Sequence, residues 1–216
     1  MNISRSEIRR YLGMMKADAH THTDDLIEEC VALLEETAHP RFTYARFPLI
    51  FADGFPCIES HVIRSKNLGA NLSGCREVCI MAVTLGADVD RLIQKYEFLS
   101  MSKAAVLQAA AAAMTEEVCD HVNALIRKEA EKDRLYTRAR FSPGYGDLSL
   151  ETQKLIFSLI NLPKEIGLTL NSSLLMSPFK SVTAFIGLSP FVSDQKSGCE
   201  NCELSPTCEY RDKEVS

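Results

Sequence analysis

Three segments of the chain repeat their apolar residues at the spacing of an α-helix. The first is SRSEIRRYLG near the N-terminus, a predicted short helix that Ser4 caps and Gly13 ends. The second is DDLIEECVALLEETA, a predicted amphipathic helix with Thr23 or Asp24 as its N-cap. The third and longest is residues 102–133, where an alanine run without Gly or Pro favours a helix with a closely packed face.

Alternating or continuously apolar segments predict the strands. Two strands joined by a turn at Asp53-Gly54 are predicted by RFTYARFPLIF and CIESHVIRS. The unbroken apolar run EVCIMAVT predicts a strand buried on both faces, which Gly86 separates from the predicted helix ADVDRLIQKY. The last third of the chain predicts the strands LYTRARFS, IGLTL and SVTAFIGLS, and a helix SLETQKLIFSLIN with Ser149 as its N-cap.

The order of these elements bears on the fold class. Strands and helices come in clusters without strict β-α alternation, which favours α+β over a doubly wound parallel fold. We therefore predict an α+β fold with one curved, mostly antiparallel sheet and flanking helices. A change of composition near residue 190 divides the chain into a folded domain, 1–190, and a cysteine-rich C-terminal tail, 191–216.

Composition narrows the range of functions. The chain has 216 residues, 46% of them hydrophobic, which is enough to bury a sizeable core. Its net charge of -5 at pH 7 argues against a nucleic-acid partner, because surfaces that bind nucleic acid are usually basic. No apolar run has the length of a membrane span and the N-terminal residues lack a signal-peptide core, so we expect a cytoplasmic protein that does not associate with membranes.

The cysteines fall into two groups. Five of them lie in apolar surroundings, which is typical of reduced, buried side chains. Cys199, Cys202 and Cys208 instead lie in the polar segment SGCENCELSPTCEYRDKE. Three thiols at this spacing predict a zinc site or an iron–sulfur cluster whose fourth ligand the sequence leaves open.

A second candidate metal site lies near the N-terminus. Asp18, His20 and His22 alternate in KADAHTHTDD, so on a strand the two imidazoles would share one face. This pattern resembles the first motif of the histidinol-phosphatase-type metal hydrolases, but few histidines follow it and no apolar strand precedes it. It also approaches the corrinoid-binding pattern Asp-x-His-x-x-Gly, with Thr23 in place of the glycine. The alternative interpretation is a solvated loop before the next helix.

The segment RARFSPGYGD, residues 138–147, has the composition of a ligand-binding turn. Arg140, at the end of an alternating strand-like run, offers a planar guanidinium that matches a carboxylate. Pro143 and Gly144 turn the chain and leave the backbone around Ser142 free to bond a ligand, while Tyr145 offers a ring face or a hydroxyl. The same residues could instead form a plain chain reversal.

The residues after this turn make a family resemblance specific. RFSPGYGDLSLETQKLIFSLI, followed by IGLTLNSSLLMSPFKSVTAFIGLS, is similar to the reactivation domain of cobalamin-dependent methionine synthase, which binds S-adenosylmethionine. The shared pattern is an Arg-x-x-x-Gly-Tyr turn, a helix, an IG-x-x-L-x-x-S segment, and then Met, Pro, a Ser-Val pair and a final strand. The resemblance covers about residues 138–189, and the cysteine tail lies outside it.

This resemblance implies a binding site. It implies that Arg140 holds the methionyl carboxylate of S-adenosylmethionine, and that the Ser142 backbone meets the adenine or ribose. It implies that Gly144, in the turn, and Tyr145, near the ligand, also belong to the binding site. The family's N-terminal aspartate, which receives the methionyl amino group, has no clear match, and Glu7 is only the nearest acid.

The resemblance also implies a reaction. The protein would support reductive methylation of inert cob(II)alamin, a reactivation step in methionine biosynthesis that needs no general base. The cobalamin would be carried by a partner, a corrinoid methyltransferase or a methionine synthase without its own reactivation domain, and an electron donor protein would take part. The alternative is a non-catalytic binding or redox-sensing module of a corrinoid system.

Overall fold

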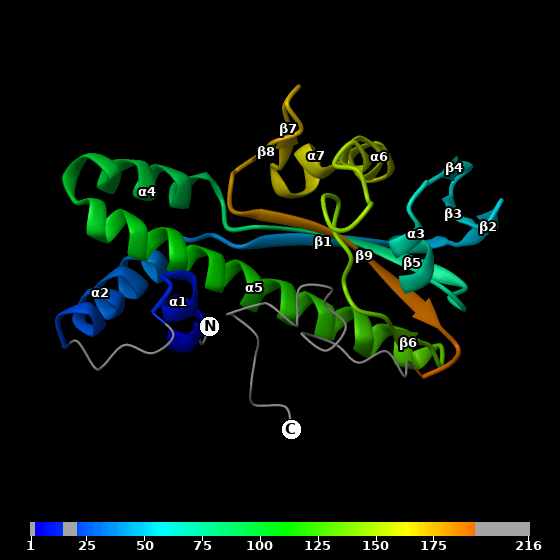
Figure 1. The fold of residues 1–216 in the computed structure, drawn as a ribbon, viewed down its shortest axis with the longest axis horizontal. Coiled ribbons are helices and arrows are strands. Elements are labelled where there is room, and N and C mark those ends of the chain that lie inside the picture. Colours follow the sequence, from blue (N-terminus) through cyan, green and yellow to red (C-terminus); the bar gives the residue numbers. More distant parts are fainter. Residues whose placement is uncertain (1–2, 15–20, 193–216) are drawn as a thin grey trace.

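A four-stranded antiparallel sheet forms the centre of the fold. The structure is a computed structural model that describes residues 3–14 and 21–192. The strand order is β1-β5-β9-β6, and the strands are β1 (Arg41–Pro48), β5 (Glu77–Thr84), β6 (Tyr136–Thr137) and β9 (Ser181–Ser189). Figure 1 shows these strands as one layer with helices above and below it.

Two smaller antiparallel sheets accompany the central one. One contains β2 (Ile50–Ala52), β3 (Phe55–Ile58) and β4 (His61–Val62), and the other contains β7 (Thr169–Leu170) and β8 (Met176–Ser177). The predicted turn at Asp53-Gly54 joins β2 to β3. The predicted second strand is divided into β3 and β4, because Glu59 and Ser60 take φ values of 47° and 68° and reverse the chain. The predicted α+β class and antiparallel pairing are confirmed.

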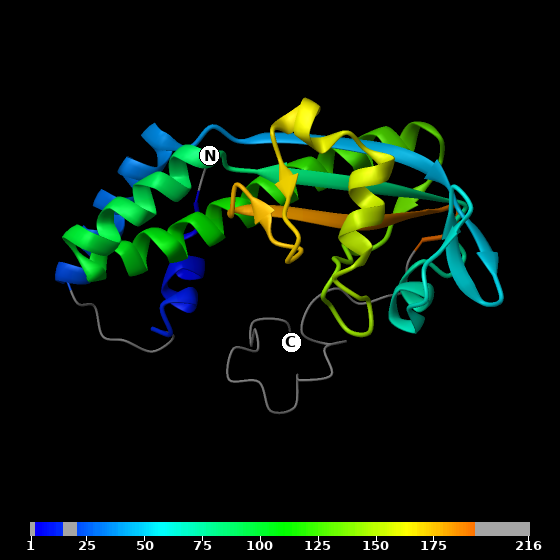
Figure 2. The same ribbon diagram turned by 90° about the horizontal axis from the view of Figure 1, so that it is seen from above.

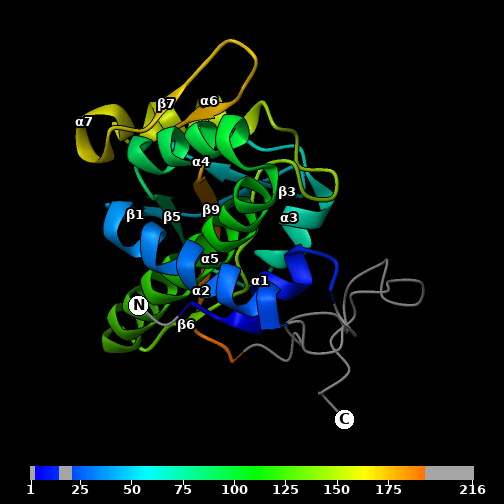
Figure 3. The same cartoon turned by 90° about the vertical axis from the view of Figure 1, so that its left-hand side faces the viewer.

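Helices cover both faces of the central sheet. One group is α1 (Arg5–Tyr11), α2 (Thr21–Thr37), α4 (Ala87–Leu99) and α5 (Met101–Lys132), and the other is α3 (Lys66–Asn71), α6 (Thr152–Leu159) and α7 (Leu162–Ile166). The long helix α5 follows the length of the sheet (Figure 2), and α1, α2 and α4 gather around it (Figure 3). None of the helices in the described ranges is both long and apolar enough to cross a membrane.

The two helix groups enclose two hydrophobic cores, one on each face of the sheet. On β5, Met81 and Val83 pack into the core beneath α5, while Ile80 and Ala82 pack into the core beneath α6 and α7. Successive residues of a strand point to opposite faces, so the central positions of a strand covered on both sides are all apolar. This arrangement explains the unbroken apolar run that predicted β5. The alanines at 109–111 and 113 are buried, which lets α5 pack closely against the sheet.

The first residues of α1, α2 and α6 show whether the predicted N-cap residues are correct. The prediction for α1 is confirmed, because the Ser4 Oγ accepts a hydrogen bond of 3.3 Å from the Glu7 N–H. Helix α2 begins at Thr21, so Asp24 lies in its first turn, where it pairs with Arg9 and does not cap. Ser149 does not cap α6 itself, which begins at Thr152, but its Oγ accepts a hydrogen bond of 3.2 Å from the Glu151 N–H in the i to i+3 turn that leads into this helix.

A close approach between the sheet and the end of α3 occurs at Gly187 on β9. A Cβ at this position would lie 2.5 Å from the Cys75 Sγ and 2.9 Å from the Leu72 Cδ2. Both of these side chains are buried. Only a glycine therefore allows the segment that closes α3 to pack directly on β9.

Candidate functional site

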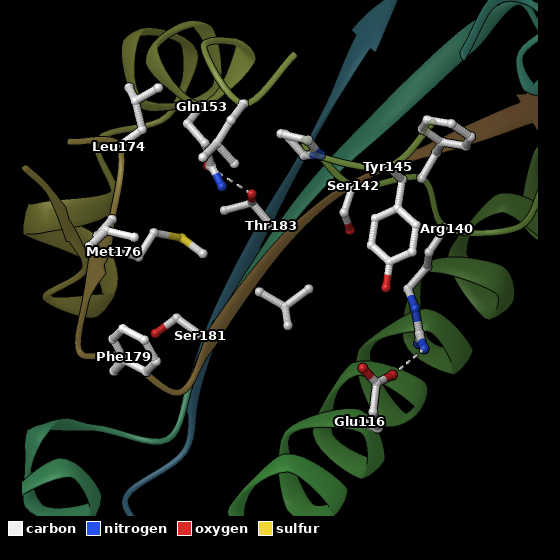
Figure 4. Close-up of a pocket in the computed structure, with 15 residues that line it drawn as sticks. Glu116, Arg140, Ser142, Tyr145, Gln153, Leu174, Met176, Phe179, Ser181 and Thr183 are labelled. Atoms are coloured by element: carbon white, nitrogen blue, oxygen red, sulfur yellow. Dashed lines mark hydrogen bonds and ion pairs between the residues drawn. The ribbon is translucent and has the colours of Figure 1, made fainter. Parts of the chain in front are cut away.

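The predicted turn lies beside a cavity of about 590 Å³. Three residues of β9, from Ser181 to Thr183, line its floor, and α5 contributes Glu116. In Figure 4, Arg140 and Tyr145 lie on one side of this cavity and the segment around Met176 lies on the other. The cavity therefore joins residues that are far apart in the sequence.

A bulge in the chain aims the two arginines of the turn in different directions. Thr137 pairs with Leu188 on β9, but Phe141 pairs with Phe185, so four steps along one chain oppose three steps along the other. The extra residue interrupts the predicted strand LYTRARFS, of which only Tyr136–Thr137 is a regular strand. The prediction of one alternating run through Arg138 and Arg140 is therefore wrong.

The bulge places Arg138 and Arg140 on opposite faces of the sheet. Arg138 lies against the end of α3, where its Nη2 donates a hydrogen bond of 3.3 Å to the Ser189 Oγ. Arg140 reaches the other face, where it meets α5. Without the extra residue, side chains two positions apart would share one face and Arg140 would not reach the helix.

Arg140 is held by two acids of α5. Its Nη1 lies 2.6 Å from the Asp120 Oδ1, and its Nη2 lies 3.0 Å from the Glu116 Oε2. The Arg140 side chain is only 22% exposed, whereas the two carboxylates are more open to solvent. An arginine carries five N–H donors, so donors remain for a ligand when both acids are bound. The arrangement presents a cation and a carboxylate side by side at the cavity wall.

The residues after Arg140 form a closed turn. The Tyr145 N–H donates to the Ser142 carbonyl at 3.1 Å, and the Gly144 N–H donates to the Leu148 carbonyl at 2.8 Å. Gly144 has a φ of 94°, a conformation that favours glycine, and it shapes the turn without lining the cavity. Ser142 and Tyr145 do line it. Among the described residues, no partner is bonded to the Ser142 N–H or to the Tyr145 hydroxyl.

The opposite wall of the cavity is apolar. It consists of residues from the β7–β8 hairpin and the segment after it, namely Leu174, Leu175, Met176 and Phe179. Phe179 is 64% exposed and Tyr145 is 68% exposed, so aromatic rings rise on both sides of the opening. The cavity thus has a charged end at Arg140 and an apolar end that suits a flat or aliphatic group.

A buried polar pair lies between these two walls. The Thr183 hydroxyl on β9 donates a hydrogen bond of 2.9 Å to the Gln153 Oε1 on α6. Both residues are buried and both line the cavity. With its oxygen bonded to Thr183, Gln153 has its amide NH₂ group available to a ligand acceptor.

The two predicted metal sites have different outcomes. Cys199, Cys202 and Cys208 lie outside the described residues, as do Asp18 and His20, so the zinc or iron–sulfur site stays a prediction. His22 lies in α2, which is a helix and not the strand on which the metal-hydrolase alternative depended. Within the described part of the chain no group of three or more His, Cys, Asp or Glu could hold a metal ion. The five other cysteines are free and buried, as predicted.

The sequence predicts one wall of the cavity and not the others. Arg140, Ser142 and Tyr145 come together as expected. Glu116 was missed because it is one of many acids on a helix. Gln153 was also missed, although its place three residues before the buried Ile156, on the apolar face of α6, is a signal that a sequence can show.

Three comparisons place this fold among known proteins. No curated protein matches the chain significantly. Among solved structures, the chain is similar to "Crystal Structure of the MetH Reactivation Domain bound to AdoHcy", with 18% sequence identity and a TM-score of 0.63 over 87% of this chain and 71% of that chain. At this identity the similarity shows a shared fold. The family model for "Vitamin B12 dependent methionine synthase, activation domain" matches residues 70–195, which is more than half of the chain. The protein therefore belongs to the family of vitamin B12-dependent methionine synthase activation domains.

Proposed function

We propose that the protein binds S-adenosylmethionine in the 590 Å³ cavity and supports reductive methylation of cob(II)alamin on a partner protein. The observation that carries the proposal is the pairing of Arg140 with Glu116 at the wall of this cavity. An amino-acid ligand carries a carboxylate and an ammonium on one carbon, so it needs a cation and an acid side by side. The solved structure with the similar fold is described as bound to AdoHcy, which is the product that S-adenosylmethionine leaves after methyl transfer.

Each end of the ligand has a matching group in the cavity. Arg140 receives the methionyl carboxylate through the N–H donors that Glu116 and Asp120 leave over. Glu116 accepts from the methionyl ammonium. The adenosyl end lies between the Ser142 backbone and the apolar wall, with the Tyr145 ring beside it.

The charge of the wall suits a sulfonium ligand. Arg140 with its two acids carries one net negative charge. S-adenosylmethionine carries one net positive charge, because its sulfonium and ammonium outnumber its carboxylate. Complementary charge in a partly buried site favours binding, and the demethylated product lacks the sulfonium charge. We therefore expect the substrate to bind more tightly than the product.

Glu116 replaces the aspartate that the resemblance implied near the N-terminus. Glu7 does not take this role, because it pairs with Arg10 on α1 and does not line the cavity. Glu116 lines the cavity and already contacts Arg140. The proposed acceptor of the methionyl amino group is therefore on α5.

The proposed chemistry is a methyl transfer that follows a reduction. The electron donor protein gives one electron to cob(II)alamin, and the resulting cob(I)alamin attacks the S-adenosylmethionine methyl carbon. A cobalt–carbon bond forms, the carbon–sulfur bond breaks, and its electron pair stays on sulfur in S-adenosylhomocysteine. The protein contributes orientation of the methyl group and exclusion of water, so it needs no general base.

The partner's corrinoid would dock over the mouth of the cavity. Exposed apolar side chains surround this opening, namely Tyr145, Leu150, Leu175 and Phe179. An apolar rim of this kind excludes water when a flat ring covers it. The partner is a corrinoid methyltransferase or a methionine synthase without its own reactivation domain, in the cytoplasm.

Two measurements test the proposal in sequence. Calorimetric titration of the purified chain with S-adenosylmethionine tests binding. Binding is rejected if the titration releases no detectable heat and S-adenosylmethionine does not compete with S-adenosylhomocysteine. The second experiment mixes the chain with a cob(II)alamin-loaded methionine synthase that lacks its reactivation domain, S-adenosylmethionine and a low-potential reductant. The absorption spectrum should change to that of methylcobalamin only when all components are present. Binding without this change would leave the alternative, a non-catalytic binding or redox-sensing module.

A further inference from the structure

The cavity turn is attached to helix α3 through the side chain of Asp147. The Asp147 Oδ2 accepts a hydrogen bond of 2.7 Å from the Lys66 N–H, and its Oδ1 accepts one of 3.2 Å from the Asn67 N–H. Ser65, the N-cap of α3, donates its hydroxyl to the same Oδ1. One carboxylate therefore bonds three donors at the start of a helix that is some eighty residues earlier in the chain.

These bonds hold the carboxylate in its charged form. The hydrogen bond from Ser65, together with the backbone bonds from Lys66 and Asn67, lowers the pKa of Asp147 below its usual value. An ionised carboxylate at the first N–H groups of a helix is a favourable partner for them. Asp147 thus serves α3 as a cap that comes from another part of the chain.

The residue before Asp147 fits the same contact. Gly146 has a φ of 52°, and a Cβ at this position would collide with the side-chain amide of Asn67. The φ favours glycine, and the Asn67 side chain, which is exposed, would have to turn away from any larger residue. After Asp147, Leu148 is buried and closes the turn by accepting from the Gly144 N–H at 2.8 Å.

Helix α3 is itself fixed in the core. Leu68 and Leu72 are fully buried in the core beneath the central sheet. A continuous path therefore runs from the core through α3 and Asp147 to the turn. Ser142 and Tyr145, which line the cavity, lie within five residues of Asp147 on this path.

We infer that Asp147 is a positioning residue, which holds the Ser142–Tyr145 wall in its ligand-binding shape by bonding the start of α3. The inference rests on the proposed function, since it names the cavity as the S-adenosylmethionine site. Asp147 does not line the cavity, so it acts through the turn and not by contact with the ligand. A wall that is held in place before the ligand arrives loses little conformational freedom on binding, which raises affinity.

The test compares Asp147→Ala with Glu151→Ala. Both substitutions remove one negative charge from the same segment, but the Glu151 side chain is exposed and pairs with the exposed Lys154. Asp147→Ala should weaken S-adenosylmethionine binding by a factor of about 5–30 in calorimetry, whereas Glu151→Ala should leave it unchanged. Asp147→Asn should fall between Asp147→Ala and the unchanged protein, because its one carbonyl oxygen keeps part of the bonding to α3.

Hydrogen exchange supplies a readout that does not depend on the ligand. In Asp147→Ala the amides of Tyr145 and Leu148, which bond the carbonyls of Ser142 and Tyr145, should exchange faster, while amides of β5 keep their protection. Equal affinities of Asp147→Ala and Glu151→Ala, or a lost affinity without faster exchange in the turn, would overturn the inference. If the unchanged protein does not bind S-adenosylmethionine, the proposed function fails, and the exchange result still shows whether Asp147 holds the turn.

Discussion

The hydroxyl of Thr183 donates to the side-chain oxygen of Gln153 at 2.9 Å, and this bond joins β9 to α6 beneath the cavity. Thr183 is 1% exposed and Gln153 is 4% exposed, so water does not replace either partner easily. A buried polar group left without a partner costs about 1–3 kcal/mol, whereas replacing both partners by apolar groups can be nearly neutral. Comparing a variant that lacks one partner with a variant that lacks both therefore distinguishes a structural role of Gln153 from a role in ligand binding.

The first prediction uses this pair. Gln153→Leu should lower the free energy of unfolding by about 1–3 kcal/mol, measured by chemical denaturation, and adding Thr183→Val should restore most of it. Affinity for S-adenosylmethionine should stay lowered in both variants, because the Gln153 amide no longer meets the ligand. If affinity returns together with stability in the double variant, Gln153 serves only the fold.

The second prediction concerns Arg140. Arg140→Ala should lower the affinity for S-adenosylmethionine roughly tenfold to hundredfold, since hydrogen bonds to charged groups contribute about 1.5–3 kcal/mol. Arg46→Ala is the matched control, because Arg46 is equally shielded and also pairs with acids on another part of the surface, closely with Glu77 and Asp133 and at 4.0 Å with Glu129. Both variants should lose a similar amount of stability in thermal unfolding. An equal effect of both on affinity would remove Arg140 from the site.

The third prediction tests the proposed acceptor of the ammonium. Glu116→Gln should weaken S-adenosylmethionine binding about tenfold in calorimetry, because a carboxylate that faces a cation becomes neutral. Glu117→Gln changes the same charge on the next residue of α5, which does not line the cavity, and should bind normally. The preference for S-adenosylmethionine over S-adenosylhomocysteine should also shrink in Glu116→Gln. Normal affinity in this variant would contradict the assignment.

The fourth prediction separates the ring of Tyr145 from its hydroxyl. Tyr145→Ala should cost about 1–3 kcal/mol of binding free energy, the range measured when an aromatic ring is removed from a nucleobase. Tyr145→Phe keeps the ring face and should cost less. Tyr136→Ala removes an exposed tyrosine that does not line the cavity and should bind like the unchanged protein. A loss in Tyr145→Phe as large as that in Tyr145→Ala would assign the binding role to the hydroxyl.

The fifth prediction concerns the C-terminal cysteines. Protein purified without oxygen should contain about one metal site per chain, held by Cys199, Cys202 and Cys208, and Cys202→Ser should lower this content. Iron with acid-labile sulfide would indicate a cluster that passes an electron to the corrinoid, and we expect this outcome, whereas zinc would indicate a structural site. Cys57→Ala, which changes a buried cysteine of β3, should leave the metal content unchanged. A reduced tail without metal would contradict the prediction.

The main strands were predictable because each is recognised from its own residues. β5 and most of β9 are buried on both faces, so their apolar runs stand out without knowledge of their neighbours. The bulge between Thr137 and Phe141 was not predictable, because polar and apolar residues alternate regularly from Arg138 to Ser142. Only pairing with β9 shows which residue is the extra one.

The candidate site was predictable to the extent that it lies in one segment. Arg140 and Tyr145 share a turn, and their spacing is visible in the sequence. Glu116 gains its role from a contact with Arg140 across 24 residues, and no local pattern reports such a contact. A site that is assembled from four elements thus reveals only its most local part before the fold is known.

Gly187 determines how closely β9 and the end of α3 pack together, at a place outside the cavity. With a hydrogen atom in place of a side chain, β9 lies against the end of α3 without a spacer. A methyl group there would move α3 outward, and the turn bonded to α3 through Asp147 would move with it. Gly187 does not line the cavity, yet it supports the turn from two sides, because its carbonyl also accepts a hydrogen bond of 2.8 Å from the Arg138 N–H. We therefore expect a substitution at Gly187 to disturb the cavity from inside the fold, with every residue that lines the cavity unchanged.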